Sequence, residues 1–284
     1  IVDLRSHPDV QAFLKRKGIS NESKADEVLQ WVPDAIVIRM WPERVQGDVG
    51  PDAQDGYVGF NIYQPSPTDT TGAVDYTDAS YFIVMSLKGE IAHLKILENG
   101  TPTYGSPRID GLKLMDPEHF LFAYNTNPDD EVGSAFTYDW KADRFTTLAN
   151  GSWGNSHDVQ WEAPPNENAR IWRPLVDGCI AQDVVTGDIV ESLDTHGAVH
   201  DVNHCQALLD TPFAVLNSRI TNSFTKHNRE TGENVFTIGG AKGEYDIIDS
   251  DGHRHAAGTT LFYGQHNLEY FGENEYMLFD NSYN

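Results

Sequence analysis

Residues 181–193, AQDVVTGDIVESL, have the pattern of a β-hairpin: a short β-rich run, a tight turn at Thr186-Gly187 and a second run. Glycine supplies the positive φ that a two-residue hairpin turn requires, so the sequence predicts two antiparallel strands joined by such a turn. Three other stretches follow the same plan: VMSLKGEIAHL (84–94), TYDWKADRFTTL (137–148) and TKHNRETGENVFTI (225–238).

The hairpins recur at a nearly constant interval. Thr231-Gly232 lies 45 residues after Thr186-Gly187, and Ala142-Asp143 lies 44 residues before it. A period of this length with hairpins inside it is the sequence signature of a β-propeller blade. The predicted fold is therefore all-β, a propeller of about six blades when complete. We expect an N-terminal helical or irregular segment over 1–55 and propeller blades over 56–284.

Both ends of the chain bear on this prediction. HPDVQAFLKRKGI (7–19) and NESKADEVLQWV (21–32) have apolar residues at helical spacing, which predicts a short helical region. The sequence stops at MLFDNSYN (277–284), where a fifth unit would turn back. Because open sheet edges associate readily, we expect a missing C-terminal part or a second polypeptide to complete the ring.

Charge and composition exclude several classes of partner. Among 284 residues, 43 are Asp or Glu and 20 are Lys or Arg, giving a formal net charge of −23. The negative electrostatic potential of a protein with this charge repels nucleic acid and anionic lipid surfaces. No apolar run approaches the length of a membrane-spanning helix, so no span is expected. The acidic residues are interpreted as a solvated surface.

The cellular compartment is predicted from weaker features. The chain begins IVDLRSHPDVQAFL, without an initiating Met or a signal peptide, which is compatible with a removed leader. Glycosylation sequons occur at Asn21, Asn99 and Asn150. The two cysteines, Cys179 and Cys205, do not define a disulfide scaffold, and whether they are bonded stays open. We expect a secreted, periplasmic or lumenal protein.

A second repeated pattern places histidines at equivalent positions. GNSHDVQW (154–161), GAVHDVNH (197–204) and GQHNLEY (264–270) each have a Gly, then a His followed by Asp or Asn, then a predicted strand. In a propeller, such positions converge at one mouth of the central channel, which would gather imidazoles around one pocket. The alternative is that the repeated Gly and His have a structural role only, in which the His makes hydrogen bonds between strands. The histidines lack tight ligand spacing, so no metal site is predicted. Surface positions are expected for His196, His227, His253 and His255.

From Asp201 to Asn281 the chain resembles the arylsulfotransferase family. Six elements occur in the order that this family shows: Asp201 with His204, Ser218-Arg219, Thr231-Gly232-Glu233, Gly239-Gly240, Gln265-His266 and Phe279-Asp280-Asn281. HDVQW (157–161) is similar to the earlier His motif of the family, and SLKGEIAHL (86–94) to its first inter-strand turn. The resemblance covers about residues 56–284.

The resemblance implies a six-bladed propeller that transfers a sulfuryl group from a phenolic sulfate ester to a phenolic acceptor. The family works through a sulfohistidine, without a cofactor and without the nucleotide sulfate donor. His266 would be the nucleophile and Arg219 a bidentate clamp for the sulfuryl oxygens. His204 and His157 would hydrogen-bond those oxygens or exchange the phenol proton. The expected substrate-binding residues are His200, Asn203, Gln206 and Gln265.

Two other functions stay open. Gln206 stands where the family has Asn, which favours a propeller that has kept the scaffold as a binding or assembly module without catalysis. The other is a hydrolase or lyase that uses the same pocket with a metal. The internal repeat also aligns His200, rather than His204, with His157 and His266, so either residue could face the channel.

Overall fold

A computed structural model describes residues 4–19, 56–65, 76–86, 90–98, 109–127, 132–148 and 158–281, apart from residues 165, 198 and 210. The chain divides into two compact units, Ile1–Ile109 and Asp110–Asn284. The boundary expected between residues 55 and 56 stays a prediction, because 20–55 lie outside the described residues. The possible helix at 21–32 lies there too.

The described residues of the first unit form one α-helix, a short 3₁₀ helix and one sheet. Its elements are η1 (Leu4–Ser6), α1 (Pro8–Arg16), β1 (Tyr57–Pro65), β2 (Tyr76–Ser86) and β3 (Ile91–Glu98), with the strands antiparallel in the order β1-β2-β3. Helix α1 begins at Pro8, whose fixed φ suits the first helical turn, and His7 caps it by accepting from the Asp9 amide. The helix predicted within 7–19 is confirmed.

Helix α1 is held by an apolar face. Val10, Phe13 and Leu14 are buried at the spacing of one helical stripe. They belong to one core cluster with strand residues of the same unit, among them Tyr81 and Ile83. Phe13 meets Tyr81 edge-on, with ring centroids 6.4 Å apart. Tertiary packing therefore stabilises a helix that is too short to form alone in water.

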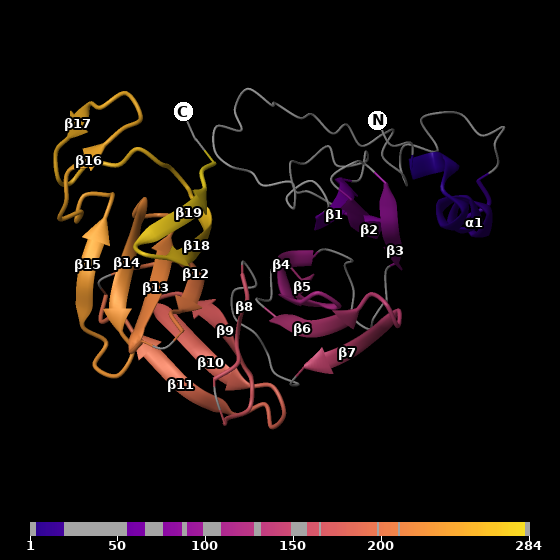
Figure 1. The fold of residues 1–284 in the computed structure, drawn as a ribbon, viewed down its shortest axis with the longest axis horizontal. Coiled ribbons are helices and arrows are strands. Elements are labelled where there is room, and N and C mark those ends of the chain that lie inside the picture. Colours follow the sequence, from indigo (N-terminus) through magenta and orange to yellow (C-terminus); the bar gives the residue numbers. More distant parts are fainter. Residues whose placement is uncertain are drawn as a thin grey trace. The chain divides into compact units, whose positions relative to one another are not determined.

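The second unit consists of antiparallel sheets (Figure 1). The first has the order β4-β5-β6-β7: β4 (Ile109–Asp116), β5 (His119–Asn127), β6 (Val132–Asp139) and β7 (Arg144–Leu148). The second has the order β8-β9-β10-β11: β8 (Gln160–Glu162), β9 (Arg170–Leu175), β10 (Gly178–Asp183) and β11 (Ile189–Asp194). The third has the order β12-β13-β14-β15: β12 (Val202–Ala207), β13 (Phe213–Ser218), β14 (Ser223–Asn228) and β15 (Asn234–Ile238).

Two shorter hairpins follow, formed by β16 (Ile247–Ile248) with β17 (Arg254–His255), and by β18 (His266–Gly272) with β19 (Glu275–Phe279). Among the described residues, strands therefore dominate both units, and α1 is the single α-helix. The all-β prediction is confirmed at this level. Each four-stranded sheet connects its strands in sequence order, as a meander.

The repeated hairpin has a common turn that differs from the predicted one. Asp139, Asp183 and Asn228 each end an inner strand, and each side-chain oxygen accepts two backbone N–H groups of the following loop at 2.8–3.1 Å. The loop has four residues after Asp139 and five after Asp183 and Asn228, so the expected two-residue turn is wrong. The fourth residue of each loop has positive φ, +51° at Asp143, +79° at Gly187 and +71° at Gly232. The side-chain oxygen stabilises a longer loop, and its fourth position requires the left-handed conformation.

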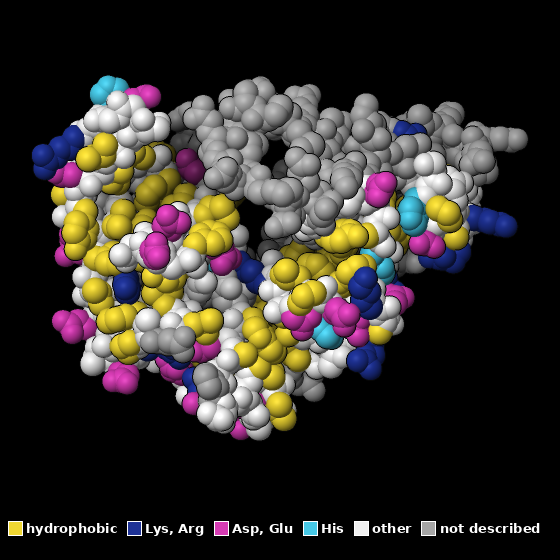
Figure 2. Space-filling model, in the orientation of Figure 1, with side chains coloured by type: hydrophobic (Ala, Val, Ile, Leu, Met, Phe, Trp, Pro, Cys, Tyr) yellow, Lys and Arg dark blue, Asp and Glu magenta, His cyan; other side chains and the backbone are white. Residues whose placement is uncertain are grey.

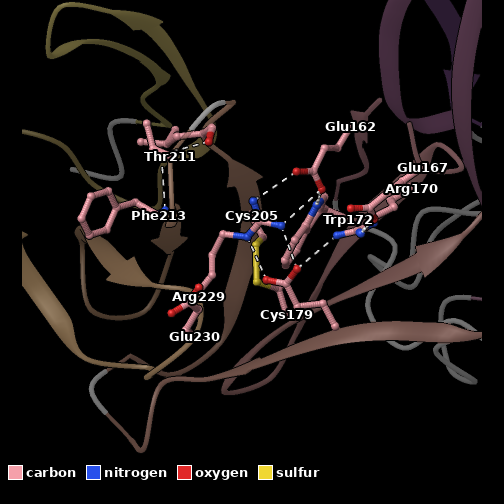
Figure 3. Close-up of polar contacts among 12 residues, drawn as sticks. Glu162, Glu167, Arg170, Trp172, Cys179, Cys205, Thr211, Phe213, Arg229 and Glu230 are labelled. Carbon is pink, nitrogen blue, oxygen red and sulfur yellow. Dashed lines mark hydrogen bonds and ion pairs between the residues drawn. A yellow bond between two sulfur atoms is a disulfide. The ribbon is translucent and has the colours of Figure 1, made fainter. Parts of the chain in front are cut away.

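Two features join the meander β8–β11 to the meander β12–β15 (Figure 3). A disulfide links Cys179 of β10 to Cys205 of β12. Arg229, which follows β14, donates to both carboxylate oxygens of Glu191 at 2.8 and 2.7 Å and to Glu162 Oε1 at 3.1 Å. Its guanidinium lies 4.9 Å from the centroid of the Trp172 ring. Bidentate pairing and stacking need the planar fork of arginine, so these contacts fix the mutual position of the two sheets.

Loss of the disulfide is expected to lower the stability of the second unit. The bond closes a loop with a sequence separation of 26, and the chain-entropy relation gives about 3.5 kcal/mol for such a loop. The double variant Cys179→Ala with Cys205→Ala should therefore unfold at a lower urea concentration than the parent. Reducing the parent protein should reproduce the shift, and reductant should leave the double variant unchanged. An equal urea midpoint for parent and variant would contradict this expectation.

On the face drawn in Figure 2, Asp and Glu side chains lie scattered among apolar and neutral ones. This distribution fits a solvated acidic surface rather than a single charged patch. Within the described part of the chain, no helix has the length and apolar character needed to cross a membrane.

Candidate functional site

The first strands of four sheets in the second unit bring polar residues together. Strand β12 contacts both β8 and β18, and Lys113 of β4 reaches Glu269 of β18. The same lysine lies beside Asp158, which closely precedes β8. Asp158 in turn contacts His204 of β12. Segments up to 156 residues apart in sequence therefore meet in one polar cluster.

Lys113, Asp158 and Glu269 form the charged part of this cluster. The Lys113 Nζ atom is 3.4 Å from Asp158 Oδ1 and pairs closely with Glu269 Oε1. Gln160 Nε2 also donates to Glu269 Oε1, at 3.0 Å. Burial acts to lower the pKa of Lys113, but the two carboxylates outweigh it and the pKa is raised. Burial acts to raise the pKa of Asp158, and Lys113 and His204 more than offset it. Lys113 and Asp158 therefore stay ionised at neutral pH.

His204 is fully buried on β12. Its Nδ1 atom lies in ion-pair contact with Asp158 Oδ2, and neither ring nitrogen has a hydrogen-bond partner among the described residues. A buried polar atom without a partner is uncommon and calls for an explanation, such as a bound water or a catalytic role.

A group of buried amides lies next to this cluster. Asn203 Nδ2 and Asn217 Nδ2 both donate to the Gln265 carbonyl oxygen at 2.8 Å. Asn217 Nδ2 also donates to Asn203 Oδ1 at 2.8 Å, and Asn203 Nδ2 lies 3.2 Å from His266 Nδ1. The Gln265 side chain donates to the carbonyls of Ser218 and Ser223, both at 3.0 Å. These bonds connect β12 and β13 to the start of β18.

His266 and Arg219 lie at the half-buried side of the cluster. Burial lowers the pKa of His266, and the Arg219 charge lowers it further, against the opposing influence of Asp158 and Asp201. A neutral imidazole beside a guanidinium is therefore the resting state. Arg219 donates through Nε to Asp201 Oδ2 at 3.3 Å, and its Nη2 atom is 3.2 Å from the same oxygen.

Arg219 also borders a cavity. The cavity has a volume of about 320 Å³ and is lined by Arg219, Asn222, Tyr263 and Gly264. This volume lies at the lower end of small-molecule pockets, roughly 300–1,000 Å³. Asn222 Oδ1 accepts from the Gly264 amide at 2.8 Å, which fixes one wall. The cavity therefore offers one cationic side chain and one aromatic side chain to a ligand.

The other predicted site residues have different positions. His157 lies outside the described residues. His200 has a side chain that is 62% exposed and paired with Asp177. Gln206 accepts from the Tyr270 amide at 2.8 Å and so connects β12 to β18. The structure thus brings His204, Arg219, His266 and the amides of Asn203 and Gln265 together, and places His200 apart from them.

Among the histidines expected at the surface, His227 is an exception. His227 is buried on β14, with Nδ1 3.1 Å from the Gly232 carbonyl oxygen and Nε2 3.0 Å from Thr225 Oγ1. The predicted surface position was wrong, because both ring nitrogens find partners within the hairpin. His196 and His253 have side chains that are 71% and 74% exposed.

One group of possible metal ligands occurs in the β16–β17 hairpin. Asp249, Asp251 and His253 have donor atoms within 4.8 Å of one another. Asp249 is already paired with His255, 3.0 Å away, and this hydrogen bond is the main cause of its pKa of about 2. The carboxylate has protein partners, and we assign no metal to it.

Sequence reasoning did not identify Lys113, Asp158 and Glu269 as site residues. Asp158 and Glu269 lie inside the repeated motifs HDVQW and QHNLE, so their positions were available as a signal. Lys113 lies in IDGLKLMD, a stretch without a matching repeat. Its role becomes visible only from its partners in space.

Comparisons with known proteins give no family. No family model and no curated protein matches the chain. Among solved structures, a similar chain belongs to Kuenenia stuttgartiensis hydrazine synthase, with 10% sequence identity and a TM-score of 0.37 over 62% of this chain and 51% of that one. The matched part spans about half the length of that chain. We take no functional argument from a likeness of this size.

Proposed function

We propose that the sheets of the second unit are blades of a β-propeller. Three successive four-stranded meanders and the repeated hairpin at intervals of 44–45 residues support this arrangement. The first strand of each meander contributes to the polar cluster, as expected of the innermost strand of a blade.

We further propose that the protein is an arylsulfotransferase-like enzyme. It would transfer a sulfuryl group from a phenolic sulfate ester to a phenolic acceptor through a histidine. The observation that carries this proposal is the grouping of a neutral His266 with Arg219 and the buried His204. A sulfuryl group is anionic and presents three oxygens, which suits an arginine fork and imidazole donors. The resemblance gives the nucleophile role to His266.

The site explains why these residue types occur together. An imidazole must be neutral to supply a lone pair, and burial together with Arg219 keeps His266 neutral. Arg219 is held by Asp201 through one carboxylate oxygen, so its fork keeps further N–H groups for a ligand. The disulfide fits a secreted, periplasmic or lumenal location, which we also propose.

Incubation with a chromogenic aryl sulfate tests the enzyme proposal. The protein alone should gain the mass of one sulfuryl group and release the phenol, and a second phenol should then remove the group with ping-pong kinetics. Trapping should be done at neutral or alkaline pH, because sulfohistidine is labile in acid. A folded protein that gains no sulfuryl group and shows no turnover would contradict the proposal and favour a binding module. Metal-dependent release of sulfate would instead favour the hydrolase alternative.

A further inference from the structure

Asp201 holds the guanidinium of Arg219 along one edge. Arg219 Nε donates to Asp201 Oδ2 at 3.3 Å, and Arg219 Nη2 lies 3.2 Å from the same oxygen. The Nε–H group and one N–H of Nη2 form this edge of the planar group. The terminal pair of N–H groups, one on each Nη atom, points away from it. A ligand at the cavity can therefore bind the terminal pair while Asp201 keeps the side edge.

The backbone around Asp201 is held on both sides. The carbonyl oxygen of the preceding residue, His200, accepts from the hydroxyl of the buried Ser218. The amide of the following residue, Val202, donates to the Val176 carbonyl at 3.2 Å. Between these two bonds Asp201 has φ +54°, a conformation that Asp and Asn adopt more readily than most residues. The carboxylate is therefore attached to a well-anchored peptide segment.

The loop that carries Arg219 is bonded to the opposite wall of the cavity. The Ser218 carbonyl accepts from Gln265 Nε2 at 3.0 Å, and the Gly264 amide donates to Asn222 Oδ1 at 2.8 Å. Arg219 and Asn222 line the cavity from one side of these bonds, and Gly264 lines it from the other. The guanidinium is therefore presented to the cavity by a loop that is fixed at both of its ends.

The single positive charge at the cavity is already balanced. Among the described residues that line the cavity, Arg219 alone is charged, and its partner Asp201 has the opposite charge. Lys113, the other cation of the polar cluster, is paired with Asp158 and Glu269. A ligand with one negative charge can pair with Arg219. A second negative charge finds no further unpaired cation among these residues, and the Asp201 carboxylate repels it.

We propose that Asp201 makes the cavity selective for singly charged aryl esters: it orients the terminal N–H pair of Arg219, and its own charge rejects ligands that carry two negative charges. A sulfate monoester carries one negative charge. A phosphate monoester of the same shape carries nearly two above about pH 7. The inference rests on the proposed function and deepens it, because the site would then accept sulfuryl esters and reject the corresponding phosphate esters.

Isothermal titration calorimetry with phenyl sulfate and phenyl phosphate at about pH 8 tests this selectivity. At the intermediate dielectric constant of a half-exposed site, Coulomb's law gives a factor of about 10 in affinity for each unit of ligand charge. The parent should therefore bind phenyl sulfate at least about 10-fold more tightly. Asp201→Asn keeps the size of the side chain and suits the positive φ, but removes the charge. The ratio of the two dissociation constants should then fall about 10-fold.

The ratio separates a charge effect from a purely structural one. A structural role of Asp201 would weaken both ligands equally in Asp201→Asn, and an unchanged ratio would overturn the inference. Asp201→Glu retains the charge and should keep the parental ratio even where both affinities fall, so loss of selectivity in this variant would also overturn it. Asp194→Asn, at a side chain that is 68% exposed, removes the same charge elsewhere and should leave the ratio unchanged.

Two further measurements locate the ligands and separate this inference from the proposed function. Arg219→Ala should lose most of the affinity for phenyl sulfate, and unchanged binding would place the ligand elsewhere and overturn the inference. If the ratio behaves as expected and no sulfuryl group is transferred from p-nitrophenyl sulfate, the proposed function fails and the selectivity stands. Transfer together with equal ratios in the parent and Asp201→Asn would overturn the selectivity and leave the proposed function intact.

Discussion

Replacing Arg219 with lysine is expected to reduce kcat/KM for aryl-sulfate turnover about 10²-fold, and replacing it with alanine up to about 10³-fold. Lysine retains the charge but loses the planar fork that binds two oxygens at once. Alanine removes both. Because charge develops on the sulfuryl oxygens in the transition state, the loss should fall mainly on kcat rather than on KM.

The folded state should tolerate both changes. The Arg219 side chain is 40% exposed, and its partner Asp201 stays in contact with solvent at 22% exposure. A matched control is Arg144→Lys, whose side chain is 71% exposed at the start of β7. The control should keep parental kinetics. Unchanged kinetics in Arg219→Ala would remove Arg219 from the site. The pKa of His266 should also rise in Arg219→Ala, because a nearby positive charge is lost.

Local features of the fold could be predicted from the sequence, because short-range chemistry determines them. The predicted hairpins occur in the structure at the expected spacing. In each, the side-chain oxygen of Asp139, Asp183 or Asn228 accepts hydrogen bonds from backbone amides of the loop that follows it. The prediction of a two-residue turn was wrong because glycine alone did not reveal the length of the loop. The side-chain oxygen four residues before each positive-φ residue carried that information.

The site depends on contacts that one sequence does not reveal. Lys113 and Glu269 are 156 residues apart and meet only because the fold brings their strands together. The choice between His200 and His204 also needed the structure. The repeat aligns His200 with His266, and both are followed by a residue of positive φ, Asp201 and Asn267. Asp177 nevertheless pairs with His200 at the surface, whereas Asp158 pairs with His204 in the interior.

Removing the partly buried cation of Lys113 should have the largest effect on stability. Lys113→Met leaves the buried Asp158 and the partly buried Glu269 without their cation, and breaking a buried ion pair by removing one partner costs up to about 3–5 kcal/mol. The urea midpoint of the second unit should fall accordingly. The exposed Lys242→Met, also in this unit, is the matched control and should change the free energy of unfolding by less than about 0.5 kcal/mol.

The loss of stability in Lys113→Met should also depend on pH. In the parent, Lys113 and His204 lower the pKa of the Asp158 carboxyl in the folded state below its value in the unfolded chain. The ionised carboxylate therefore stabilises the fold above its unfolded-state pKa. This contribution is lost as the pH falls through its folded-state pKa. In Lys113→Met, burial of Asp158 loses its main compensation and its pKa should rise. The folded variant then binds a proton more readily than the unfolded chain, so its stability should increase as the pH falls from about 7 toward about 5. The difference between parent and variant in urea unfolding should therefore shrink with acidification. A difference that is independent of pH would mean that the Lys113→Met substitution costs stability through packing alone, and that Lys113 does not serve to keep Asp158 ionised.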